Sequence, residues 1–84
     1  MKLQETIAIE LTTTLTQLKM PADTVIFAEQ AEYYIGRSQS VDAIVANVFC
    51  ENFPNWLNID DQINDAIEDC IQRVKIARLE EQFS

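Results

Sequence analysis

A proline and a glycine, fifteen residues apart, mark the two ends of one helix in this chain. Pro21 suits the first turn of a helix, where an amide proton would have no partner within the helix. Gly36, the only glycine of the chain, can adopt the left-handed conformation that often closes a helix. We therefore predict a helix over residues 21–35, a turn over residues 36–40, and a second helix over residues 41–53 that begins at a serine or aspartate cap.

Apolar residues lie all round the predicted helix at residues 21–35. Four of them lie close to one stripe, namely Val25, Ala28, Ala31 and Ile35, and four lie off it, namely Ile26, Phe27, Tyr33 and Tyr34. A helix that is apolar on several sides is usually buried on several sides. In a chain of only 84 residues, this pattern indicates a partner chain.

The segment before Pro21 fits two structures. Apolar residues recur at helical spacing on one face, at Leu3, Ile7, Leu11, Leu15 and Leu18. The stretch from Ile7 to Leu15 also alternates as a half-buried strand would, and the β-branched run at residues 12–14 favours that strand. Helix and strand both stay open for residues 3–12, and residues 15–20 can alternate as a short strand.

A second proline, Pro54, ends the helix at residues 41–53, and Asn58 can cap a last helix over about residues 59–82. Apolar and small residues repeat there as in a short coiled-coil seam, at Ile63, Ile67, Cys70, Val74 and Ala77. A different face carries Ile76, Leu79 and Phe83, so this helix can meet two surfaces. Its acids lie in the first half and its bases in the second, which complements the helix dipole or forms an acidic patch for a basic partner.

Composition limits the class of protein. With 84 residues we expect one domain, residues 1–84. The 14 acids and 6 bases give a net charge of −8, which favours a basic partner over nucleic acid. No apolar run approaches the length of a membrane span, and the N-terminus lacks a secretory signal, so we expect a cytoplasmic protein.

The residue types needed for catalysis are scarce. The chain has no histidine, and its two cysteines, Cys50 and Cys70, are expected to be buried thiols rather than a disulfide. Residues 58–65 alternate oxygen ligands but lack the glycine that a calcium loop needs. Ser40 does not stand in the Asp-Ser-Leu context of an acyl carrier. We expect no catalytic residue, no metal and no cofactor, and therefore not an enzyme.

Residues 15–53 resemble a ribbon-helix-helix DNA-binding domain, most closely the antitoxins of the ParD type. The resemblance lies in the order Leu15–Met20, Pro21, a helix to Ile35, Gly36-Arg37-Ser38-Gln39-Ser40, and a second helix with the pairs Ile44-Val45 and Val48-Phe49. It implies a mainly α fold, a homodimer in which one short strand per chain pairs across the dimer, with an extra C-terminal helix. Residues 1–13 would be an N-terminal extension, residues 14–53 the core, and residues 54–84 a helical arm that binds a partner.

The resemblance also implies a function, that of an antitoxin-like autorepressor. Gln17 and Lys19 would read operator DNA from the ribbon, while Arg37 and Ser40 would hold a phosphate. With so few cations, DNA binding would be weak and salt-sensitive. A toxin would bind the C-terminal arm, at Trp56, Ile63, Ile67, Val74 and Leu79.

A second hypothesis is an all-α four-helix bundle. The helical stripe from Leu3 to Leu18 and the net charge of −8 favour it. Such a protein would be a small acidic interaction protein, an inhibitor, immunity or adaptor protein, that binds a basic protein partner and no DNA.

Overall fold

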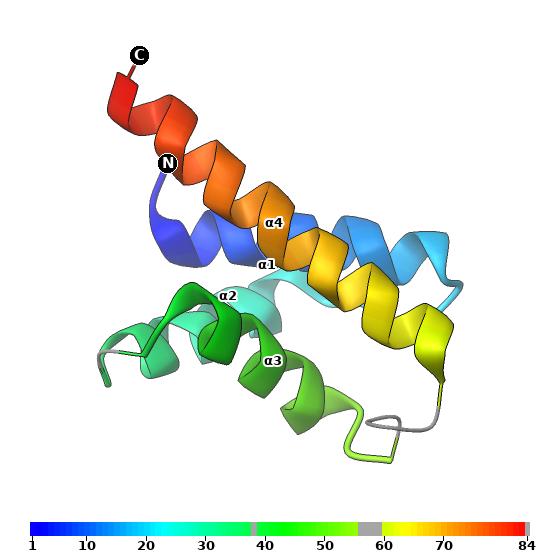
Figure 1. Cartoon of the computed structure of the whole chain (residues 1–84). Coiled ribbons are helices and arrows are strands. Elements are labelled where there is room, and N and C mark those ends of the chain that lie inside the picture. Colours follow the sequence, from blue (N-terminus) through cyan, green and yellow to red (C-terminus); the bar gives the residue numbers. More distant parts are fainter. Residues whose placement is uncertain (38, 56–59, 84) are drawn as a thin grey trace.

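A computed structural model of the chain describes residues 1–37, 39–55 and 60–83. These residues form four helices: α1 (Leu3–Gln17), α2 (Thr24–Ile35), α3 (Val41–Asn52) and α4 (Asp61–Phe83). Helix α1 packs against each of the other three helices, and Figure 1 shows α4 crossing it on one side and α2 and α3 lying on the other. In the described part of the chain, no helix is both long and apolar enough to cross a membrane.

The expected ribbon-helix-helix fold is wrong, because the ribbon is missing. Helix α1 continues to Gln17, and the described residues contain no strand. The alternative expectation, an all-α four-helix bundle, agrees with the structure. The homodimer was expected because strands from two chains would pair, and residues 14–20 provide no such strand.

Residues 18–20 close α1 and do not extend as a strand. The amide of Met20 donates to the carbonyl of Leu15 at 2.9 Å, and the amide of Lys19 donates to that of Thr16 at 3.1 Å. This pair of bonds is the Schellman motif, which needs a left-handed residue just after the helix. Lys19 supplies it with a φ of 60°, the only positive φ among the described non-glycine residues.

Side-chain caps define the starts of α2 and α3. The Asp23 carboxylate accepts from the amide of Ile26 at 3.1 Å, and the Ser40 hydroxyl accepts from that of Ala43 at 3.2 Å. Helix α2 thus starts a few residues after Pro21. Gly36 follows its last residue as expected, but with a right-handed φ of −61°.

Two threonines of the β-branched run in α1 are compatible with a helix because their hydroxyls bond back to its backbone. Thr13 and Thr14 each donate to the carbonyl four residues earlier, at 2.9 Å. These bonds satisfy hydroxyl groups that would otherwise favour turns or helix ends. The β-branched run therefore does not end the helix.

One apolar cluster joins all four helices. Its buried members are Ile7, Ala8, Leu11, Leu15, Phe27, Ala31, Ile44, Val45, Val48, Phe49, Ile63, Ile67, Cys70, Ile71 and Val74. Burying a side chain of the size of leucine stabilises a fold by about 1.5–3 kcal/mol. Helix α1 runs through the expected boundary between residues 13 and 14, so residues 3–13 belong to the core and are not an appendage.

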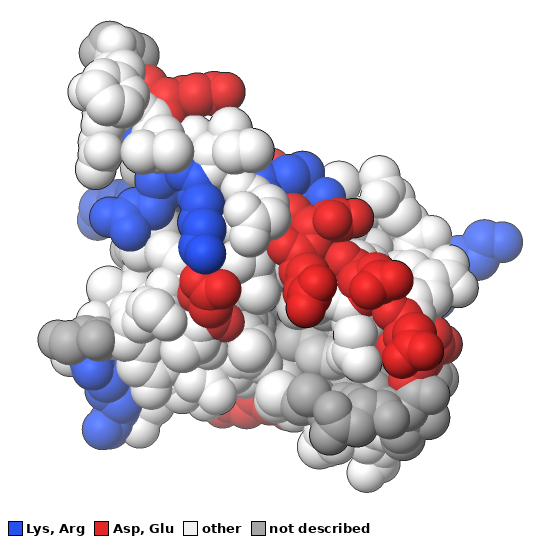
Figure 2. All heavy atoms as spheres, viewed as in Figure 1, with Lys and Arg blue, Asp and Glu red and all other residues white. Residues whose placement is uncertain are grey.

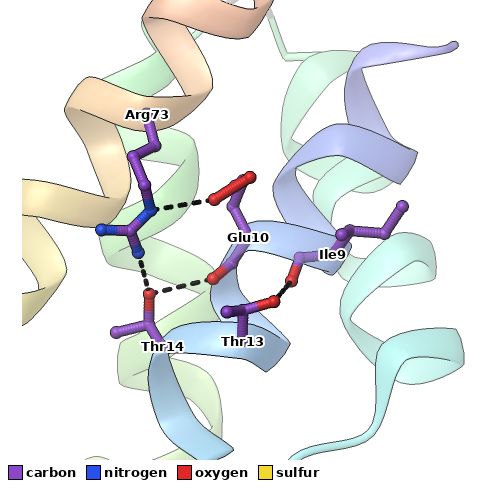
Figure 3. A network of polar contacts seen from close by, with 5 residues as sticks. All are labelled: Ile9, Glu10, Thr13, Thr14 and Arg73. Atoms are coloured by element: carbon purple, nitrogen blue, oxygen red, sulfur yellow. Dashed lines mark hydrogen bonds and ion pairs between the residues drawn. The ribbon is translucent and has the colours of Figure 1, made fainter. Parts of the chain in front are cut away.

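A polar network fixes α4 against α1 (Figure 3). The Arg73 Nε donates to the Glu10 Oε2 at 2.9 Å, and the Arg73 Nη2 donates to the Thr14 hydroxyl. The Thr14 hydroxyl in turn donates a hydrogen bond to the backbone carbonyl of Glu10. The guanidinium group thereby bridges two residues one helical turn apart on α1, which sets the register of the two helices.

Candidate functional site

A largely apolar groove lies between α1 and α2. It has a volume of about 430 Å³ and is lined by Gln4, Glu5, Ala8, Ile9, Thr24, Val25, Ala28, Glu29 and Glu32. Ile9 is 43% exposed and Val25 is 68% exposed. Ala8, next to Ile9 in sequence, is buried, and Ala28, three residues after Val25, is half-buried; both also line the groove. Their small size lets another helix approach closely, because the distance between packed helices depends on the side chains at the contact.

Three carboxylates surround this apolar surface. Glu5 stands in the first turn of α1, and Glu29 and Glu32 stand on α2; all three are exposed. None of them forms an ion pair with another described residue. The groove therefore combines an apolar floor with uncompensated negative charge.

Several cations of the chain are engaged elsewhere. Arg73 pairs with Glu10, Lys75 contacts Asp42 at 2.7 Å, and the Arg37 guanidinium lies 4.3 Å from the centre of the Tyr33 ring. The hydrogen bond from Lys75 lowers the pKa of Asp42 below its usual value. These partners lie outside the residues that line the groove.

A second acidic surface runs along the first half of α4. Figure 2 shows carboxylates gathered there and basic side chains over the second half of the helix. The exposed acids are Asp61, Asp65, Glu68 and Asp69. A smaller hollow of about 290 Å³ between α3 and α4 adjoins Glu68, but it is lined by one carboxylate only.

The four residues expected to contact DNA do not form one surface. Gln17 ends α1 and Lys19 closes it, whereas Arg37 follows α2 and Ser40 caps α3. Helix α2 separates the two pairs, and its 12 residues span about 18 Å. Figure 1 shows the connection between α1 and α2 and the connection between α2 and α3 at opposite ends of the bundle.

Most of the residues expected to bind a partner through a C-terminal arm face the chain's own core. Ile63, Ile67 and Val74 are 5%, 8% and 0% exposed. Leu79 is 53% exposed and remains available at the surface. Trp56 lies outside the described residues.

The groove was only partly visible in the sequence. The apolar residues all round α2 indicate a partner, but they do not show which of them faces it: of the stripe that holds Val25 and Ala31, the core takes Ala31, and it also takes Phe27 from off the stripe. Ile9 and the three glutamates gave no signal of their own, because an exposed isoleucine or glutamate is common on any helix. Their proximity depends on how α1 and α2 pack.

The two cysteines are not activated as nucleophiles. Burial raises the pKa of the Cys50 and Cys70 thiols, so both are protonated at neutral pH and are poor nucleophiles. Within the described residues, no group of three or more histidine, cysteine or acidic side chains could hold a metal ion. Comparisons with protein-family models, curated proteins and solved structures find no match to this chain.

Proposed function

We propose that the chain is a small acidic interaction protein that binds a basic amphipathic helix of a protein partner in the groove between α1 and α2. The observation that carries this proposal is the exposed apolar surface of Ile9 and Val25 beside three glutamates that form no ion pair with any described residue. Isolated apolar residues are common on protein surfaces, but a contiguous apolar groove is typical of an interaction site.

The charge of the groove selects the partner. Glu5, Glu29 and Glu32 attract lysine or arginine side chains that flank an apolar stripe. The net charge of −8 adds a long-range attraction that speeds encounter with a basic partner and weakens as salt increases.

A helix suits this groove better than an extended peptide. Extended peptides usually add a strand to the edge of a sheet, and the described residues contain no sheet. A helix that lies between α1 and α2 would present apolar side chains at i, i+3, i+4 and i+7, which is the usual pattern of helix-in-groove binding. Binding of a protein partner is also the part of an antitoxin-like function that needs no ribbon.

A synthetic peptide tests the proposal. The probe is an amphipathic helix of about 16 residues with leucine on one face and lysine on both flanks. Its matched control carries glutamate at every lysine position. We expect the lysine peptide to bind with a Kd of roughly 1–100 µM in low salt, and the glutamate peptide not to bind. Amide chemical shifts in NMR spectra should move for α1 and α2 residues of the groove.

Two variants separate the groove from general acidity. Glu29→Gln with Glu32→Gln should weaken binding about tenfold, since each charged contact contributes about 0.5–1 kcal/mol. Asp65→Asn with Glu68→Gln removes the same charge from α4 and should change binding less than threefold. Shift changes confined to α4, or no binding at about 1 mM peptide, would refute the proposal.

A further inference from the structure

The carboxylates of the groove between α1 and α2 all lie towards one of its ends. Figure 1 shows α2 running back along α1, so that the last turn of α2 lies beside the start of α1. The Thr12 and Thr24 hydroxyl oxygens are 2.9 Å apart, which fixes the start of α2 beside the later part of α1. Glu5 and Glu32 therefore share the other end of the groove, and Glu29 lies one turn before Glu32 on the same face of α2. We call this the acidic end.

The opposite end of the groove carries no charge. Ile9, Thr24 and Val25 line it, and we call it the neutral end. Ala8 and Ala28 lie between the two ends. Along α1 the ends are about 10 Å apart, since each residue of a helix adds about 1.5 Å. This distance is similar to the Debye length of about 8 Å at physiological salt, so a bound cation interacts unequally with the two ends.

Among the described residues, no other charged side chain lines the groove. The Asp23 carboxylate, next to the neutral end in sequence, accepts from the amide of Ile26 and caps α2. Glu10, which follows Ile9, pairs with Arg73 of α4. Lys2 precedes the acidic end but is not part of the lining. Because the dipoles of two antiparallel helices oppose one another, the three glutamates decide the difference between the ends.

We infer that the groove binds its partner helix in one direction, with the basic residues of that helix gathered over the acidic end and an uncharged apolar stretch over the neutral end. The inference rests on the proposed function and adds a direction to it. A lysine over the neutral end would lie against apolar side chains, where no carboxylate compensates for its lost hydration. Two or three weak charged contacts together favour one direction about tenfold. The position of the bases in the partner, and not its backbone polarity, thus sets how it lies.

Two peptides of the same composition test the inference on the full chain. Each is an amphipathic helix of about 16 residues with leucine along one face, uncharged termini and a nitroxide label at its C-terminus. One carries lysine only in its C-terminal half and glutamine at the matching positions of its N-terminal half, and the other has the reverse order. The label of the first peptide should broaden the amide NMR signals of Glu5 and Glu32 more than those of Thr12 and Thr24. The label of the second should broaden those of Thr12 and Thr24 more.

Variants of the chain identify the charges that set the direction. Glu5→Gln with Glu32→Gln should raise the Kd of both peptides about threefold to tenfold and reduce the difference in broadening between the two ends by more than half. The control, Asp65→Asn with Glu68→Gln, removes the same charge from α4 and should preserve the direction.

The outcomes separate this inference from the proposed function. Binding in the groove with the same label position for both peptides would overturn the direction alone, because the backbone and not the lysines would then orient the helix. If neither peptide binds at about 1 mM, both the groove as a binding site and the direction are refuted. Circular dichroism checks that the variants keep their helix content.

Discussion

At the residue scale, the guanidinium of Arg73 links two helices of the fold through two polar contacts. It joins the Glu10 carboxylate and the Thr14 hydroxyl of α1 to α4 (Figure 3). Both ionic side chains are partly exposed, 41% for Arg73 and 27% for Glu10, so solvent screens the pair. We predict that Arg73→Met and Glu10→Gln each lower the free energy of unfolding by about 1–2 kcal/mol.

A double-mutant cycle in urea measures how much of this loss belongs to the pair itself. The coupling between Arg73→Met and Glu10→Gln should be about 1 kcal/mol. Arg78→Met serves as the control on the same helix, since Arg78 has no ion pair among the described residues, and should change stability by less than about 0.5 kcal/mol. Additive effects of the two substitutions would contradict the role given to this bridge.

At the element scale, the end of α1 depends on one residue in an unfavourable conformation. Lys19 adopts a φ of 60°, which costs an L-residue with a side chain roughly 1 kcal/mol. Lys19→Gly should therefore raise the free energy of unfolding by about 0.5–1 kcal/mol, although glycine also gains entropy in the unfolded chain. Lys19→Ala keeps the conformational cost and should show no such gain. Thermal unfolding of the three proteins, followed by circular dichroism, decides between them.

The same helix end explains why the sequence misled at residues 15–20. Their alternation is real, but Leu18 and Met20 reach the core from a helix terminus and not from a strand. A Schellman motif closed by lysine in place of glycine lacks the usual sequence signal. From the sequence alone, a short strand at residues 15–20 before Pro21 could therefore not be distinguished from a helix that ends there.

Other helix ends were predictable because their causes are local. The predicted segment at residues 41–53 corresponds to α3, Val41–Asn52, and the segment at about residues 59–82 corresponds to α4, Asp61–Phe83. Serine at a helix start and proline after a helix end act within a few residues. The choice between helix and strand at residues 3–12 was open because it depends on tertiary contacts: Ile7 and Leu11 are both 0% exposed in the core.

The candidate groove belongs to the features that only tertiary packing creates. Glu5 and Glu29 are far apart in sequence and line the same hollow because α1 packs against α2. Hydrophobic periodicity indicates which side of a helix is buried, but it does not identify the neighbouring helix or the gap between them. The sequence therefore predicts an acidic protein with a partner, and the packing creates the groove in which we propose that the partner binds.

At the scale of the whole molecule, negative charge opposes folding while it favours a basic partner. A net charge of −8 on 84 residues destabilises the compact state through repulsion. Glu29 and Glu32 illustrate the conflict, since like charges three residues apart on a helix cost about 0.2–0.5 kcal/mol. Residues kept for binding often reduce stability in this way.

We predict that the triple variant Glu5→Gln, Glu29→Gln, Glu32→Gln is more stable than the natural chain. In about 0.02 M NaCl its unfolding free energy should rise by roughly 1 kcal/mol, which corresponds to about 4–8 °C in Tm for a domain of this size. The gain should shrink by more than half in about 0.5 M NaCl, where charges are screened within a few ångströms. Lys2→Gln, which removes an exposed positive charge, should lower the Tm in low salt. An unchanged Tm in the triple variant would show that repulsion among these glutamates does not destabilise the fold. Their presence in the groove would then be no sign that stability is reduced in favour of binding.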